Sequence, residues 1–215
     1  MTDEQGAPDA LLLMTAGCPH CPAALQSLTA LLKEAAIGRL EIINVAIHTD
    51  EAEKRGVQSV PWAQIGPFEI EGVMNPARLR ELALGVHDNA VFDAWVLDLL
   101  KSGKRQKFES LIQRDPQRIH ALARLMENPE TSMAIRLGIG AVLEELQGSG
   151  VTEALVPKLG KLLQSQDALL ATDAAHFLTL IGGQIIHPWM QAAETHSNSD
   201  IREIAAEWLA ENGNQ

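Results

Sequence analysis

Cys18 and Cys21 are the two cysteines of this 215-residue chain, and they enclose the segment CPHC. Two thiols at this spacing suit a reversible disulfide or a site for a soft metal ion such as Cu(I) or Zn²⁺. A structural coincidence is the third reading, because the CxxC spacing alone is a weak signal. The choice depends on the elements that position the pair.

The residues on either side predict that CPHC lies in a turn between a strand and a helix. The apolar segment ALLLMT, which begins at Ala10, is typical of a buried strand, and a helix is expected from about Pro22 to Ala36. Cys18 would then lie just beyond the helix N-terminus. Unpaired N–H groups and the positive end of the helix dipole favour a thiolate there, and the thiolate is the nucleophile.

The next segments predict more strands and helices. LEIINVAIH (40–48) is rich in β-branched residues and predicts a central strand, followed by a short helix through Arg55. PWAQIG and FEIEG predict two strands joined by a Gly-Pro turn. Asn75 is expected to cap a last helix that ends before Gly85. The predicted order over residues 10–86 is β-α-β-α-β-β-α, after a flexible N-terminus at 1–9.

From about residue 88 the sequence predicts helices alone. AAHFLTLIG (174–182) and AAEWLAENG (205–213) share one pattern 31 residues apart, and GAVLEELQG (140–148) fits it more loosely, 34 residues before 174. A shorter helix is expected before each copy, near 117–127, 151–164 and 184–195. Helix pairs at this period predict an all-α solenoid.

With the IR of 135–136 and the DIR of 200–202, residues 116–215 resemble short HEAT-like repeats. Residues 87–115 fit the repeat pattern poorly. We therefore expect them to form connecting or capping helices between the two halves of the chain.

A second motif favours the interpretation of the cysteine pair as a reversible disulfide. SVPW (59–62) places Pro61 forty residues after Cys21, at the start of a predicted strand. In CPHC and this Val-Pro, residues 10–85 resemble a compact thioredoxin-fold domain of the glutaredoxin-like kind. The resemblance implies that Cys18 attacks, that Cys21 resolves the mixed disulfide, and that a cis Pro61 faces the pair.

The resemblance also implies a docking edge for substrate at Val60 and Pro61, with Trp62 beside it. For Pro61 the alternative is an ordinary trans proline that begins a strand, and for Trp62 it is packing within the strand. Two positions depart from larger thioredoxins. Leu12 stands where they often carry a buried aspartate, and Gly17 stands where they often carry a tryptophan before the first cysteine.

We assign tuning of the cysteine pKa to His20 and Pro19. A histidine between the cysteines can donate a hydrogen bond or positive charge to the Cys18 thiolate, which stabilises the reduced form. The alternative for His20 is an exposed spacer. The same CPHC segment occurs in strongly oxidising periplasmic thiol oxidases. The segment therefore favours an oxidant, whereas the expected cytoplasmic compartment keeps thiols reduced.

Composition excludes several other classes of function. A net charge of −11 argues against a nucleic-acid partner, and the basic cluster between Lys101 and Arg118 is expected to be a solvated helical face. The start, MTDEQGAPDA, lacks the basic region of an export signal, and no apolar run is long enough for a membrane span, so we expect a cytoplasmic protein. No cofactor motif is present, and His176 and His187 lack the neighbours of a metal site, so we expect neither cofactor nor metal.

The sequence therefore predicts a thiol–disulfide oxidoreductase with a helical-repeat domain that binds a protein partner or client. Its partners would be proteins with thiols or disulfides, and an electron donor that the sequence does not identify. One alternative is a Cu(I) or Zn²⁺ module, although Met14 lies two residues too far from Cys18 for the loop of copper carriers. The other is a scaffold whose binding responds to the redox state of the pair. The oligomeric state is left open.

Overall fold

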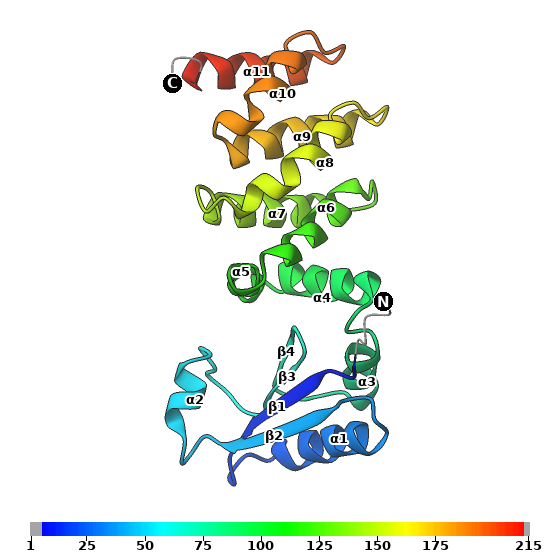
Figure 1. Ribbon diagram of the computed structural model, residues 1–215, viewed down its shortest axis with the longest axis vertical. Coiled ribbons are helices and arrows are strands. Elements are labelled where there is room, and N and C mark those ends of the chain that lie inside the picture. The colour runs from blue at the N-terminus through cyan, green and yellow to red at the C-terminus, as the bar shows by residue number, and fades with distance from the viewer. Residues whose placement is uncertain (1–5, 213–215) are drawn as a thin grey trace. The chain divides into compact units, whose positions relative to one another are not determined.

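A computed structural model describes residues 6–212 and divides the chain into two compact units, with the boundary between Trp95 and Val96 (Figure 1). The first unit has the predicted order β-α-β-α-β-β-α, and the described part of the second unit is helical, which confirms the expected fold class. The strands and helices of the first unit are β1 (Asp9–Met14), α1 (Cys21–Lys33), β2 (Arg39–Asn44), α2 (Thr49–Glu53), β3 (Trp62–Ile65), β4 (Phe68–Glu71) and α3 (Pro76–Leu84). The unit boundary falls within α4 (Asn89–Lys101). Of the segment 1–9 that we expected to be flexible, residues 1–5 lie outside the described residues, and Asp9 begins β1.

The sheet of the first unit has the strand order β2-β1-β3-β4. β1 runs parallel to β2 and antiparallel to β3, so that Leu13 lies between Ile43 and Trp62. This order contradicts the expectation that residues 40–48 form a central strand. β2 ends at Asn44, and among the described strands it has a neighbour on one side only. Ile42 is about half exposed.

One face of the sheet is buried under α1 and α3. Leu12 of β1, Leu28 of α1 and Leu79 of α3 belong to this core and are almost completely buried. Asn75 caps α3 as predicted, because its side-chain oxygen accepts the backbone N–H groups of Ala77 and Arg78. The core therefore fixes α1 against β1, and with it the CPHC turn that joins them.

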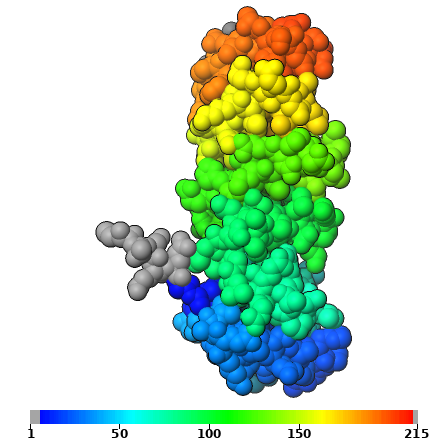
Figure 2. Space-filling view, turned by 90° about the vertical axis from the view of Figure 1, so that its right-hand side faces the viewer, coloured from blue at the N-terminus to red at the C-terminus, as the bar shows by residue number. Residues whose placement is uncertain are grey.

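The described helices of the second unit pair in sequence order. They are α5 (Arg105–Arg114), α6 (His120–Glu127), α7 (Met133–Glu145), α8 (Val156–Leu162), α9 (Ala168–Ile181), α10 (His187–Ala193) and α11 (Ser199–Asn212). α6, α8 and α10 each follow a short 3₁₀ turn and precede a longer helix. α7 packs on α9, and α9 packs on α11. In Figure 2 the green, yellow and orange parts of the chain follow one another along the helical unit. Gly213, the last residue of the third repeat copy, lies outside the described residues. None of the described helices is both long and apolar enough to cross a membrane.

An ion pair between a buried arginine and a partly buried aspartate joins α7 to α9. The Arg136 side chain is 3% exposed and donates to the carboxylate of Asp173. Its other nitrogens donate to the carbonyl oxygens of Asn128 and Thr131, at 3.1 and 2.9 Å. The guanidinium therefore also ties the turn between α6 and α7 to its own helix.

Gly160 of α8 permits a close approach of Trp189 from α10. A Cβ at this position would lie 2.4 Å from ring atoms of Trp189. We expect Gly160→Ala to lower the free energy of unfolding by about 1–2 kcal/mol, because the overpacking outweighs the gain in helix propensity. Urea unfolding followed by circular dichroism measures this loss. Gly138→Ala in α7 is the matched control, since its nearest neighbour atom, in Leu100, lies 3.5 Å away, and it should not destabilise the chain.

Candidate active site

The CPHC turn holds the two cysteines at different depths. Cys18 lies in the loop after β1 and is partly exposed, whereas Cys21 is the first residue of α1 and is fully buried. A disulfide joins them, with the two Cα atoms 5.5 Å apart. One sulfur is therefore open to a substrate, and the other is within bonding reach behind it.

Backbone polar groups surround the exposed sulfur. The backbone N–H of Cys21 donates to the Cys18 Sγ over 3.1 Å, at the N-terminal end of the 13-residue helix α1. The first turn of α1 contains no acidic residue. An N–H donor and the positive end of the helix dipole both stabilise a negative charge on this sulfur when the disulfide is reduced. The turn is therefore suited to a Cys18 thiolate.

The Val-Pro segment lies next to the cysteines because of strand pairing. β3 runs antiparallel to β1, so the start of β3 lies beside the end of β1. The carbonyl oxygen of Val60 lies 3.5 Å from the Cys18 Sγ, and the Val60–Pro61 peptide bond is cis. The fold thus brings into contact the CPHC segment and the Val-Pro segment, which lie forty residues apart in the sequence.

The remaining predicted site residues differ in their exposure. Trp62 is 1% exposed, so its ring packs in the interior of the domain. Pro61 is buried too, and Val60, whose carbonyl oxygen lies beside Cys18, is partly buried. Pro19 and His20 are exposed. His20 occupies the N-cap position of α1 without a side-chain capping bond, and its ring makes no hydrogen bond to any described residue.

The side chains beneath the site are apolar and buried. Leu12, at the position noted in the sequence, is fully buried, as is Cys21. Among the described residues of the first unit, no charged side chain is buried. The Cys21 thiol therefore has no buried carboxylate to take its proton.

Two exposed apolar side chains at the same edge of the sheet were not identified from the sequence. Ile47 follows β2 and is 73% exposed, and Val73 follows β4 and is 75% exposed. Both loops extend from the edge that carries the CPHC turn, because β1 and β2 are parallel and β4 runs antiparallel to β3. The exposure of Ile47 could not be predicted, because this residue belongs to the apolar segment 40–48 that predicts a strand.

Helix α2, which follows the same edge, carries a small network of ion pairs. Lys54 donates to Asp50 and to Glu51 over 2.6 and 3.0 Å, and Arg55 donates to Glu51 over 2.6 Å. The Lys54 hydrogen bonds hold the pKa of Asp50 and of Glu51 below their usual values, and bonding to Asp50 and Glu51 raises the pKa of Lys54. These pairs support a five-residue helix that buries no residue.

Comparison with known proteins agrees with the geometry. Residues 10–83 match a protein family described as a thioredoxin domain, a range that spans β1 to the end region of α3. No curated protein matches the chain. The first unit is a thioredoxin-like domain with a CxxC pair, an arrangement that indicates thiol–disulfide redox chemistry. Among the described residues, no group of three or more His, Cys, Asp or Glu side chains is placed to hold a metal ion.

Proposed function

We propose that this protein is a thiol–disulfide oxidoreductase in which Cys18 is the attacking thiol and Cys21 the resolving thiol. One observation carries the proposal: the exposed Cys18 Sγ accepts an N–H bond at the N-terminus of α1, with Cys21 bonded to it from the buried side. The exposed sulfur can reach a substrate. The buried sulfur can reach only the exposed one.

The reaction in the reducing direction has two exchanges. The Cys18 thiolate attacks one sulfur of a client disulfide, which forms a mixed disulfide and releases the other client sulfur as a thiolate. Cys21 passes its proton to the released client thiolate, and its sulfur then attacks the Cys18 Sγ, releases the second client thiolate and closes the Cys18–Cys21 disulfide. The client gains two electrons and two protons, and the cysteine pair loses them. A dithiol donor returns the pair to its reduced form.

The surroundings of Cys18 suit a disulfide in a polypeptide client. The Val60 carbonyl offers a backbone acceptor beside the sulfur, and the exposed Ile47 and Val73 offer apolar contacts at the same edge of the sheet. We infer that residues 116–215 form HEAT-like repeats that hold a protein partner in the cytoplasm. The recurring helix pairs support this inference, since such stacks present long binding surfaces.

An insulin reduction assay tests the proposal. With dithiothreitol as the donor, the full chain should accelerate reduction of the insulin disulfides over dithiothreitol alone. In parallel, the reduced chain is titrated with Cu(I) against a competing chelator. A chain that binds Cu(I) tightly and fails to accelerate insulin reduction would contradict the proposal and favour the metal-binding alternative.

A further inference from the structure

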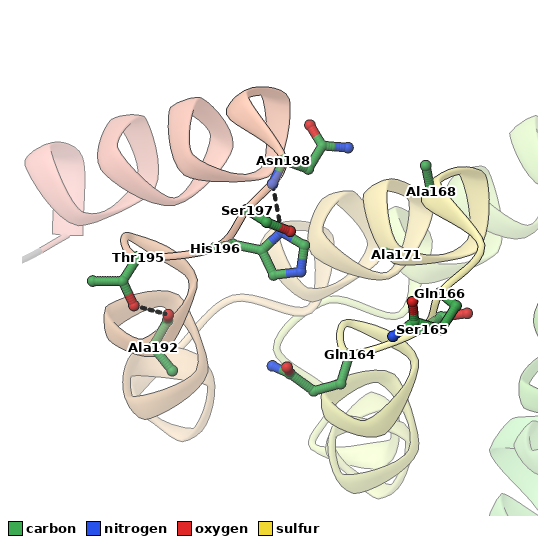
Figure 3. A pocket seen from close by; sticks show the side chains of 10 residues that line it. All are labelled: Gln164, Ser165, Gln166, Ala168, Ala171, Ala192, Thr195, His196, Ser197 and Asn198. Carbon is green, nitrogen blue, oxygen red and sulfur yellow. Dashed lines mark hydrogen bonds between the residues drawn. The ribbon is translucent and has the colours of Figure 1, made fainter.

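A polar pocket of about 370 Å³ lies between two turns of the helical unit (Figure 3). One turn joins α8 to α9 and contributes Gln164 and Gln166, and the other joins α10 to α11 and contributes Thr195 and His196. Ala171 lines the pocket from α9. No residue of this lining is charged, and the thiol chemistry of the first unit does not use it.

The neighbouring helices show what the corresponding place contains. Arg136 and Arg202 are each the fourth residue of their helices, α7 and α11. Both guanidinium groups donate to carbonyl oxygens of the turn before their own helix: Arg136 to Thr131, and Arg202 to Ser197 over 3.0 Å. In α7 and α11, therefore, an arginine side chain binds the carbonyl group five residues before it.

In α9 the fourth residue is Ala171. The corresponding carbonyl, five residues earlier, belongs to Gln166, and it accepts no hydrogen bond within residues 6–212. Where Arg136 occupies the space between one turn and the next helix layer, the small Ala171 side chain leaves the pocket open. The pocket thus lies where an arginine at position 171 would lie, and the carbonyl oxygen that such an arginine would bind accepts no other hydrogen bond among the described residues.

The C-terminal segment that carries the pocket contains more acidic than basic residues. From Leu162 to the end of the described chain, Arg202 is the only lysine or arginine, and its guanidinium donates to the carbonyl oxygens of His196 and Ser197, two residues of the pocket lining. The acidic residues in the same segment are Asp167, Asp173, Glu194, Asp200, Glu203, Glu207 and Glu211. A cationic side chain that approaches this end of the helical unit therefore meets a negative field.

The imidazole of His196 provides a flat surface within the pocket. Its Nδ1 accepts the backbone N–H of Asn198 over 3.1 Å, which holds the ring between the two turns, as Figure 3 shows. A planar guanidinium can stack on such a ring while its N–H groups donate to carbonyl and amide oxygens at the rim. The compact ammonium group of a lysine does not make both kinds of contact.

We propose that this pocket binds an arginine side chain supplied by a protein partner. The guest guanidinium takes the place that Arg136 and Arg202 occupy beside their own turns, and it donates to the Gln166 carbonyl. The proposal names one contact of the partner-binding surface, and it does not depend on the chemistry of Cys18 and Cys21.

The test uses N-acetyl-L-arginine amide as a probe of the full-length chain. NMR titration follows the side-chain amide signals of Gln164, Gln166 and Asn198, with the lysine and citrulline analogues as matched probes. We expect saturable shifts with the arginine probe and binding at least about tenfold weaker with citrulline, which has the same shape and no charge. Equal shifts with all three probes, or no saturable shift with the arginine probe, would overturn the proposal.

Variants separate the pocket from general electrostatics. Ala171→Arg supplies an internal occupant and should abolish probe binding, whereas Leu169→Arg adds the same charge at an exposed position outside the lining and should preserve it. Gln164→Ala changes an exposed lining residue without risk to the fold and should weaken binding about threefold or more. Equal weakening by Ala171→Arg and Leu169→Arg would contradict the proposal. Insulin reduction by the Ala171→Arg chain should equal that of the unmodified chain, which keeps this test separate from that of the proposed function.

Discussion

Replacing Cys18 with serine should lower the rate of insulin reduction to that of dithiothreitol alone, so that the part of the rate due to the chain falls about a thousandfold or more. The reason is that the thiolate, not the thiol, is the nucleophile in disulfide exchange, and a serine hydroxyl is not ionised at neutral pH. In this chain the Cys18 Sγ is the partly exposed sulfur and receives the N–H of Cys21. Initial rates at a fixed dithiothreitol concentration measure the loss.

Cys21→Ser is the informative partner variant. It keeps the attacking sulfur and removes the group that resolves the mixed disulfide, so a covalent complex through Cys18 should accumulate. Mass spectrometry of the complex identifies the linked residue, and dithiothreitol should release the client. Full turnover by the Cys18→Ser chain, or the absence of any complex with Cys21→Ser, would show that the two roles are assigned wrongly.

The second large effect is expected in the helical unit, from Asp173→Ala. This substitution should lower the free energy of unfolding by about 3–5 kcal/mol, because it leaves the buried Arg136 guanidinium without its carboxylate. Urea unfolding followed by circular dichroism provides the measurement. The transition of the helical unit is fitted separately, since two compact units need not unfold in one step.

A double substitution distinguishes loss of a pair from loss of packing. Arg136→Met with Asp173→Leu removes both charges and retains the volume, so its cost should be clearly smaller than that of Asp173→Ala alone. If Asp173→Ala costs less than about 1 kcal/mol, the ion pair does not hold α7 and α9 together in the way that the burial of Arg136 indicates.

The redox pair and its setting could be predicted from local sequence. An apolar strand, a CxxC and a helix follow one another directly, so the turn chemistry of Cys18 depends on neighbours in the chain. The contact between Cys18 and Val60 depends on the antiparallel pairing of β1 and β3. It could be expected from the sequence only because the Val-Pro motif resembles that of a known family. Whether Trp62 is buried or exposed could not be decided from the sequence, because a tryptophan at the start of a strand can lie on either face of a sheet.

The position of β2 in the sheet could not be predicted. An apolar, β-branched segment indicates burial, but it does not reveal how many strands lie beside it, and Ile42 and Ile47 are exposed. The end of α1 was also predicted three residues late. Ala35 has a φ of 56°, in the left-handed region, and such a backbone turn is not evident from an apolar side chain.

The pocket in the helical unit was present in the sequence only as a missing residue. The arginines of 135–136 and 200–202 were evident as part of a repeat, but Ala171 becomes meaningful only once Arg136 and Arg202 are seen to bind the carbonyl groups of their turns. A repeat pattern identifies shared positions. The function of a departure from it depends on the contacts that the shared residue makes elsewhere.

The edge position of β2 also bears on self-association. One row of its N–H and C=O groups faces away from β1, where a strand from a second molecule could pair. Arg39 and the exposed Glu41 place charges along this six-residue strand, and Arg39 is held by Asp9 of β1 over 2.9 Å. Short length and alternating charge are the features that disfavour edge-to-edge aggregation, so the thioredoxin-like domain limits strand addition where its sheet is open.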